Sequence, residues 1–209
     1  MRAIIVVCSP QECCRILNGD QSLLVRKTCP EIFKHLKSYE EGSIEVYIYC
    51  TKEEFPEVVL YSQENMYGGY MEHIGNGKVV AKFTLNKVEE IKLNFSARFF
   101  TDAFIESEIL KHSCLKTEEL ENYLLRRKGR CVNNVCGYAW HIDNLEIFDK
   151  PKELSDFNKV GYMKYAEELY REYIDDDYSK CKAWGKAEFD AHIEYRLTKV
   201  SSTYCYVEM

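Results

Sequence analysis

Two adjacent basic residues, Arg26 and Lys27, are the residues whose type and position most clearly suggest binding chemistry. They follow the apolar run Leu23–Val25 and precede Pro30, which places them at the expected end of a strand. A guanidinium in such a place can bind a phosphate or the edge of a base through two parallel hydrogen bonds. The same pair could equally be solvated charges at a strand end, and the residues alone leave both interpretations open.

Two further groups of residues could contact a nucleic acid. Residues 126–130 read Arg-Arg-Lys-Gly-Arg and could bind phosphates, but cations are also favoured at a helix C-terminus for electrostatic reasons. Trp140 and Tyr138 alternate with Ala139 and His141 in an extended pattern. An aromatic side chain there could stack on a base, although core packing is the favoured interpretation for a Trp in a strand.

Metal binding is not predicted. His141, Cys131 and Cys136 come nearest to a zinc site, but four residues separate the two cysteines, and structural zinc sites usually contain closer pairs. Residues 175–177 are three consecutive aspartates, which are more typical of a solvated helix end than of a calcium-binding loop. We therefore expect neither a metal nor an organic cofactor.

The composition predicts a folded cytosolic protein. Of the 209 residues, 46% are hydrophobic and 13% are aromatic, which is enough for a substantial core. The net charge of −6 argues against a large non-specific nucleic-acid surface, although residues 1–38 and 111–130 each carry six basic and three acidic side chains. Ten cysteines occur without a secretory signal or a membrane-length apolar run. Reduced thiols in the cytosol are therefore expected.

The elements that must position these residues are predicted from periodicity and capping. Pro10 and Glu12 favour a short helix after Ser9, and Gly19 favours the end of that helix in the left-handed conformation. Further helices are expected over residues 101–112, 117–128 and 162–173. Strands are expected over residues 2–8, 21–27, 44–50, 78–88, 138–148, 189–197 and 204–208, and residues 51–76 are expected to be irregular. The sum is an α+β fold with five to seven mostly antiparallel strands around a small barrel.

The order strand, capped helix, Gly, basic strand and Pro resembles the ASCH domain of the PUA-like superfamily. Residues 19–30 read G-D-Q-S-L-L-V-R-K-T-C-P, and Gly19, Arg26 and Pro30 match the family pattern G-x-K-x-x-E-x-R-x-x-x-P in register. Further segments are similar to phage and prophage ASCH proteins of low-GC Gram-positive bacteria, namely residues 77–91, 117–123, 137–142, 149–157 and 205–208. The resemblance covers broadly residues 1–155 and 186–209.

This resemblance implies a single PUA-like (ASCH) domain over residues 1–209, with helical insertions at about 101–130 and about 156–185. It implies a non-enzymatic module of phage or mobile-element origin that binds RNA or a nucleotide in a basic cleft beside residues 19–30. It also implies that the protein works in a bacterial or phage-infected host cytosol. The basic pair would contact phosphate or a base edge, and Gln21 and Ser22 would add hydrogen bonds. The site residues expected for this ligand are Arg26, Lys27, Gln21, Ser22 and Trp140.

An enzymatic alternative remains open. ASCH proteins that act as amidohydrolases on N4-acetylcytidine use a Lys and a Thr where this chain has Gln21 and Leu24, and neither replacement can serve as base or nucleophile. Ser22 is a nearby hydroxyl, but the sequence shows no base beside it.

A nucleobase amidohydrolase or a ribonuclease would therefore need another titratable pair, for example Lys27 or Lys78 with Glu72 or Glu45. The second alternative is a protein-interaction module, because an acidic balance and sixteen tyrosines suit a protein partner. Neither alternative involves a membrane.

Overall fold

The computed structural model describes residues 2–34, 42–64, 70–94, 99–100, 103–125, 134–175, 180–200 and 203–208. These residues form two compact units, each built from separate stretches of chain. Unit 1 comprises Met1–Pro10, Glu45–Lys82 and Ile147–Met209, and unit 2 comprises Gln11–Ile44 and Phe83–Glu146. Among the helices of the described stretches, none combines the length and the apolar character needed to span a membrane.

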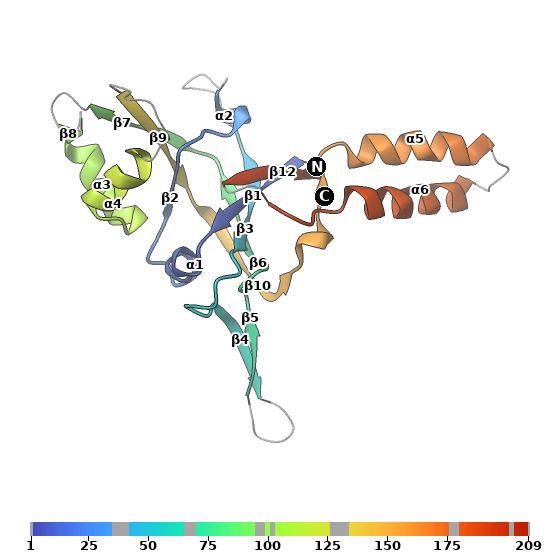
Figure 1. Ribbon diagram of the computed structural model, residues 1–209, viewed down its shortest axis with the longest axis horizontal. Coiled ribbons are helices and arrows are strands. Elements are labelled where there is room, and N and C mark those ends of the chain that lie inside the picture. Colours follow the sequence, from blue (N-terminus) through green and yellow to red (C-terminus); the bar gives the residue numbers. More distant parts are fainter. Residues whose placement is uncertain are drawn as a thin grey trace. The chain divides into compact units, whose positions relative to one another are not determined.

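Unit 1 is built on a six-stranded sheet with the strand order β10-β6-β3-β1-β12-β11 (Figure 1). Its strands are β1 (Arg2–Cys8), β3 (Ile44–Cys50), β6 (Val79–Leu85), β10 (Asp143–Lys152), β11 (Asn158–Lys159) and β12 (Tyr204–Glu208). Strands β3, β6 and β10 each contain a boundary between the two units. Strand β1 pairs in parallel with β3 and antiparallel with β12. In the core of this unit the Tyr47 and Phe157 rings meet edge to face, with their centroids 5.0 Å apart.

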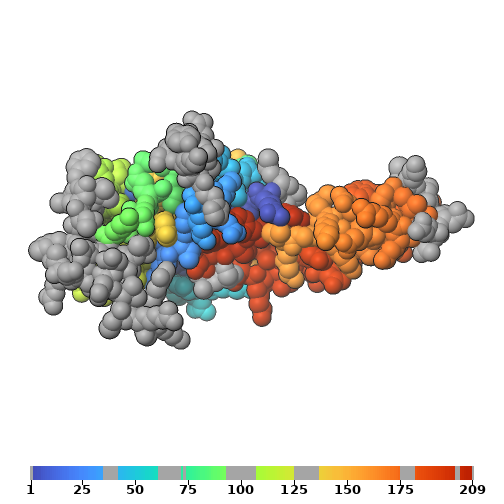
Figure 2. Space-filling model, turned by 90° about the horizontal axis from the view of Figure 1, so that it is seen from above, coloured from blue at the N-terminus to red at the C-terminus, as the bar shows by residue number. Residues whose placement is uncertain are grey.

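Two hairpins complete unit 1. Strands β4 (Val59–Glu64) and β5 (Tyr70–Ile74) form an antiparallel pair. After the short 3-10 helix η1 (Leu154–Asp156), helices α5 (Tyr162–Asp175) and α6 (Lys180–Tyr195) form a helical hairpin. Figure 1 shows these two helices side by side along their length, and in Figure 2 the orange α5 lies in front of the red α6.

Unit 2 is a four-stranded antiparallel sheet packed against two helices (Figure 1). The strand order is β2 (Leu23–Arg26), β9 (Asn134–His141), β7 (Val88–Asn94) and β8 (Phe99–Phe100). The helices of the unit are α1 (Pro10–Leu17), α2 (Glu31–Lys34), α3 (Ala103–Ser113) and α4 (Thr117–Leu125). The core joins four residues of the sheet to three of α3 and α4: Leu23, Val25, Ile91, Ala139, Ile109, Leu120 and Leu124. Helix α4 lies so close to β9 that a Cβ at Gly137 would come within 2.5 Å of Leu124 Cδ2.

Several predicted elements are confirmed. The strands expected at residues 2–8, 44–50 and 204–208 are β1, β3 and β12, and the helix that starts at Pro10 is α1. The helices expected at residues 101–112, 117–128 and 162–173 correspond to α3, α4 and α5 in the described residues. The α+β class is also confirmed.

The prediction that residues 51–76 are irregular is wrong, because this segment contains the β4–β5 hairpin. Val59 and Ile74, which pair across the hairpin, are 46% and 38% exposed. An alternating apolar pattern arises where one face of a strand is buried. The exposure of these cross-strand partners therefore explains why the pattern is weak here.

The strand predicted over residues 189–197 is also wrong, because helix α6 continues through Tyr195. Ala183, Ala187 and Ala191 follow one another at intervals of four and are fully buried, so they define the inner face of the helix. The residues that suggested alternation lie mainly outside, since Phe189 is 65% exposed and Ile193 is 51% exposed.

The long strand predicted over residues 138–148 is two strands. Strand β9 ends at His141 and β10 begins at Asp143, and Asn144 adopts a positive φ of 49° just after the break. Likewise, the strand expected over residues 78–88 ends at Leu85, and β7 starts at Val88. In the part of the chain that is described, twelve strands form three open sheets, where five to seven strands around a small barrel were expected.

Candidate functional site

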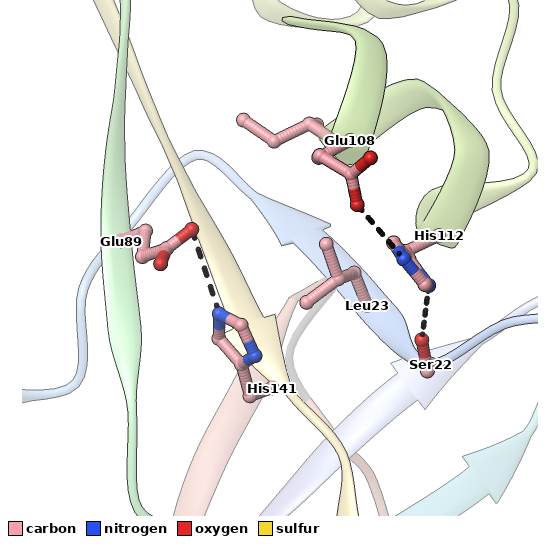
Figure 3. A pocket seen from close by; sticks show the side chains of 7 residues that line it. Ser22, Leu23, Glu89, Glu108, His112 and His141 are labelled. Carbon is pink, nitrogen blue, oxygen red and sulfur yellow. Dashed lines mark hydrogen bonds and ion pairs between the residues drawn. The ribbon is translucent and has the colours of Figure 1, made fainter. Parts of the chain in front are cut away.

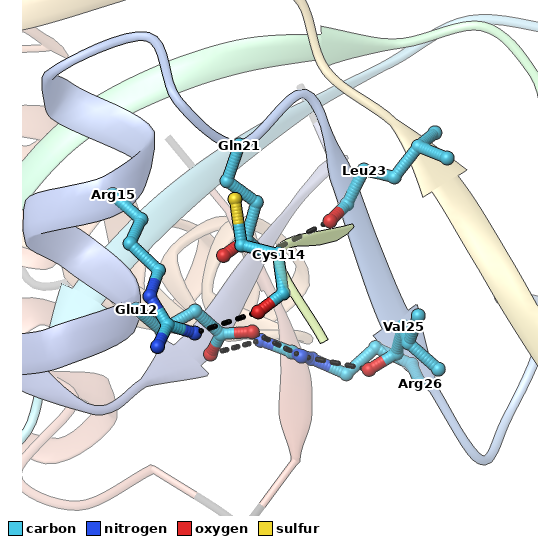
Figure 4. Close-up of polar contacts among 7 residues, drawn as sticks. All are labelled: Glu12, Arg15, Gln21, Leu23, Val25, Arg26 and Cys114. Carbon is cyan, nitrogen blue, oxygen red and sulfur yellow. Dashed lines mark hydrogen bonds and ion pairs between the residues drawn. The ribbon is translucent and has the colours of Figure 1, made fainter. Parts of the chain in front are cut away.

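Arg26, the leading candidate of the sequence, is buried at the end of β2. Its side chain is 6% exposed, and its two terminal nitrogens lie 3.0 and 3.1 Å from the two carboxylate oxygens of Glu12 on α1 (Figure 4). Its Nη1 also donates to the Val25 carbonyl at 2.8 Å. The guanidinium fork thus holds β2 to α1, and the contact of Arg26 with a ligand stays a prediction.

Gln21 has a similar internal role in the turn that precedes β2. Gly19 ends α1 with φ of +79°, and the amides of Gly19 and the next residue donate to the Ile16 and Arg15 carbonyls. Gln21 is only 4% exposed, and its Nε2 donates to the Leu23 carbonyl at 2.9 Å (Figure 4). Both features set the path of the chain into β2.

The other predicted residues fall in three different environments. The Nζ of Lys27 lies 4.9 Å from the ring centroid of Tyr123 on α4, in a cation–π arrangement. Trp140 is fully buried and pairs across the sheet with Leu24, which agrees with its interpretation as a core residue. Ser22 alone among the predicted residues lines a described pocket.

The pocket of unit 2 has a volume of about 350 Å³ and lies where β2, β9 and β7 approach α3 (Figure 3). Leu23 and Ile109 give it an apolar wall. Its polar lining consists of Ser22, Glu89, Glu108, His112 and His141. Cavities of this size hold small organic ligands, and a few polar groups in an apolar lining fix the orientation of such ligands.

One side of the pocket carries a chain of hydrogen bonds. Ser22 Oγ lies 3.0 Å from His112 Nδ1, and His112 Nε2 lies 3.2 Å from Glu108 Oε2 (Figure 3). Glu108 and His112 are one turn apart on α3, so the helix presents both on one face. The imidazole therefore bridges a hydroxyl and a carboxylate.

The opposite side of the pocket holds a second imidazole–carboxylate pair. His141 Nε2 lies 3.5 Å from Glu89 Oε2, and Leu23 stands between the two histidines in Figure 3. The side chain of Lys87 forms an ion pair with Glu89. The hydrogen bond with Lys87 is the main reason why the pKa of Glu89 is lowered. Burial opposes this effect, and the charge of His141 adds to it. Glu89 therefore stays ionised at neutral pH.

Sequence reasoning missed His112, Glu108 and Glu89. Ser22 and His112 are 90 residues apart, so the base beside the hydroxyl becomes visible only once α3 packs against β2. One local signal was available, because Glu108 and His112 have the i, i+4 spacing of neighbours on a helix.

Two of the residues considered for an acid–base pair, Lys78 and Glu45, have other partners. Lys78 forms an ion pair with Glu153 at 3.3 Å, and Glu45 forms one with Lys82 at 3.3 Å. The basic run at residues 126–130, Cys131 and residues 176–177 lie outside the described residues. Among the residues whose side chains are described, no group of three His, Cys, Asp or Glu is arranged to hold a metal ion.

Comparisons with known proteins give structural neighbours only. No protein-family model matches the chain, and no curated protein matches it. Its structure is similar to the crystal structure of ASCH from Zymomonas mobilis, with 14% identity, a TM-score of 0.43 and 73% of each chain covered. It is also similar to the N-terminal domain of McrB from Staphylothermus marinus, with 11% identity, a TM-score of 0.38, and 74% and 77% of the two chains covered. The structural neighbours thus include ASCH proteins, and at these identities and TM-scores the likeness identifies neither a ligand nor an activity for this chain.

Proposed function

We propose that the chain is an RNA- or nucleotide-binding module of ASCH type, and that the pocket of unit 2 takes one unpaired base. The observation that carries the proposal is the lining of this pocket. Two imidazoles, two carboxylates and one hydroxyl surround a cavity with an apolar wall. A base is complementary to this lining, because it has a flat apolar face and hydrogen-bonding groups at its edge.

The carboxylates favour a base that carries an exocyclic amino group. Glu89 and Glu108 are acceptors with lone pairs in addition to those that their imidazole partners use. An amino group of cytosine, adenine or guanine could donate to such an acceptor, whereas uracil offers no amino group. The same charges disfavour a phosphate inside the pocket, so the phosphate of a nucleotide would lie outside it.

This proposal changes the roles that the sequence suggested. Ser22 keeps its place as a ligand contact, while Arg26 and Gln21 shape the turn and strand that hold Ser22. A single ASCH-type domain over residues 1–209 and an origin in a phage or mobile element remain part of the proposal, and they rest on the segments of sequence that resemble that family.

The experiment compares nucleotides that differ in the amino group. Titration calorimetry with CMP, AMP, GMP and UMP should give tighter binding of at least one amino-bearing nucleotide than of UMP, by about tenfold if one good hydrogen-bonded pair discriminates between them. Fluorescence anisotropy with short single-stranded RNA would then test whether the same preference holds in an oligonucleotide.

Glu89 and its neighbour Glu90 offer a matched pair of variants. Both side chains are partly exposed on β7, at 38% and 43%, but only Glu89 lines the pocket, while Glu90 lies 3.0 Å from Lys92. Glu89→Ala should weaken binding about tenfold, and Glu90→Ala should leave it within about twofold. Equal binding of UMP, or an equal loss in both variants, would contradict the proposal.

A further inference from the structure

The hydrogen-bond chain on α3 has the connectivity of an activated hydroxyl. In the tautomer that carries its proton on Nε2, His112 donates to Glu108 and accepts at Nδ1 from Ser22 Oγ. The contacts of 3.0 and 3.2 Å are within the range over which a base can take a proton. Glu108 fixes this tautomer and would stabilise the imidazolium that forms when His112 accepts the proton.

Backbone hydrogen bonds fix the hydroxyl in place. The Ser22 amide donates to the His112 carbonyl at 3.0 Å, and the Ser22 carbonyl accepts from the Ile142 amide at 3.0 Å. The residue is nevertheless exposed and lines the pocket, so a ligand can reach its Oγ. A serine whose only role was the hydrogen bond with His112 would not need to be exposed or to line a pocket.

We propose that Ser22 is the nucleophile of an acyl-transfer site, with His112 as its general base and Glu108 as the residue that positions the imidazole. The substrate class is a small carboxylic ester whose acyl group fits beside Leu23 and Ile109. The inference uses the same pocket as the proposed function but does not require that the ligand be a base.

The reaction balances without a cofactor. Ser22 Oγ forms a bond to the carbonyl carbon as its proton passes to His112 Nδ1, and the carbon–oxygen bond to the leaving alcohol breaks as that alcohol takes the proton. Water then attacks the acyl-serine and gives a proton to His112, which returns it to Ser22 Oγ as the carboxylic acid leaves. One ester and one water give one acid and one alcohol.

An acyl-transfer site also needs a donor that stabilises the negative charge on the carbonyl oxygen, and His141 is the candidate. It lines the same pocket, and its Nε2 lies 3.5 Å from Glu89 Oε2. As an imidazolium, which donates from both ring nitrogens, His141 would stabilise from Nδ1 the negative charge that develops on the carbonyl oxygen. We therefore assign His141 the stabilisation of this oxyanion.

The test is covalent labelling of the full chain by a fluorophosphonate, followed by peptide mapping. The probe bonds its phosphorus to an activated serine oxygen and releases fluoride, so wild-type protein should carry the adduct on Ser22. His112→Asn should slow labelling about 100-fold. No adduct on Ser22, or an adduct whose rate does not depend on His112, would overturn the inference.

Hydrolysis of p-nitrophenyl acetate gives a second readout. Ser22→Ala should lower kcat/KM about 100-fold, whereas Ser155→Ala, at an exposed serine in η1, should leave it unchanged. Glu108→Gln should lower kcat about tenfold at constant KM, because a positioning residue acts on the transition state rather than on ester binding. Equal rates in wild type and Ser22→Ala would contradict the inference even if Ser22 reacts with the probe.

Binding and labelling separate this inference from the proposed function. Wild-type protein that prefers CMP over UMP and also carries the probe on Ser22 supports both proposals. Labelling of Ser22 without discrimination among nucleotides would leave the acyl-transfer site and remove the base pocket. Discrimination among nucleotides without labelling of Ser22 would leave the base pocket and remove the acyl-transfer site.

Discussion

Arg26 is best tested as a structural residue, because its guanidinium is engaged by Glu12 and the Val25 carbonyl. Removing one partner of a buried pair leaves the other charge uncompensated. We expect Arg26→Ala to lower the free energy of unfolding by about 3 kcal/mol, measured by urea denaturation. Arg15→Ala, which removes a single 3.2 Å bond to the Cys114 carbonyl, should cost about 1 kcal/mol.

The same variants decide whether Arg26 also binds a ligand. If the pocket of unit 2 is the binding site, folded Arg26→Ala protein binds CMP as wild type does, because the pocket lining does not include Arg26. A variant with unchanged stability and lost RNA binding would show instead that Arg26 contacts the nucleic acid, as its position at the end of a strand first suggested.

At the scale of single residues, the sequence could indicate Ser22 as a site residue but not His112 as its partner. The hydroxyl lies in a recognisable turn after Gly19, whose left-handed conformation was predictable from residue type. His112 and Glu108 lie on a helix that reaches Ser22 only through tertiary packing, and His141 meets Glu89 only through the register of β9 with β7. Local patterns contain neither piece of information.

At the scale of elements, Gly19 controls how α1 ends and β2 begins. A Cβ at Gly19 would meet no atom within 4 Å, so the cost of Gly19→Ala comes from its φ of +79° alone. We expect this variant to lose about 1 kcal/mol of stability in urea denaturation.

Gly185 in α6 is the matched control for Gly19. A Cβ at Gly185 would also meet no atom within 4 Å, but this residue lies within a helix and has no positive φ. Gly185→Ala should therefore stabilise the protein by about 0.5–1 kcal/mol. Loss of stability in both variants would show that space rather than backbone conformation limits these positions.

The α5–α6 hairpin carries a phenol–carboxylate hydrogen bond that should respond to alkaline pH. Tyr173 donates to Asp190 at 2.7 Å, and this bond is the main reason why the pKa of Tyr173 rises from 10.0 to about 12. Because the folded pKa is the higher one, the stabilisation is complete below pH 10 and is lost as the pH rises through about 12.

Urea denaturation between pH 8 and pH 11.5 measures this effect. Wild type should lose more stability over this range than Tyr173→Phe, which has no phenol to ionise. Tyr170→Phe is the control, because it keeps the ring contact with Trp184, whose centroid lies 5.3 Å away, and it leaves the Tyr173 bond intact. Parallel pH profiles for wild type and Tyr173→Phe would contradict the assignment.

Helix α6 also shows why some elements were misjudged. Apolar residues at every second position suggested a strand, but the buried alanines at every fourth position define the true inner face. Small residues contribute little to an apolar pattern, although their size allows α5 and α6 to approach closely. Helix α1 was predictable, because its start and stop signals are local.

At the scale of the whole molecule, each unit depends on distant parts of the chain. Strand β12 lies between β1 and β11, and Val207 within it is fully buried in the core of unit 1. Deleting residues 203–209 would remove the antiparallel partner of β1 and expose that core. We expect the truncated protein to lose the cooperative unfolding of unit 1, measured by near-ultraviolet circular dichroism on heating. An unchanged transition would show that β1 and β3 need no partner at β12.

The most direct measurement of the central claim follows the histidine ring signals by NMR while CMP is added. His112 and His141 line the pocket, whereas His192 lies on α6 and meets Asn158 Oδ1 at 2.8 Å. With signals assigned from His→Asn variants, a base-binding pocket predicts that CMP shifts the signals of His112 and His141 and leaves that of His192 unchanged. Unchanged signals from both pocket histidines at saturating CMP, or a shift confined to His192, would contradict it.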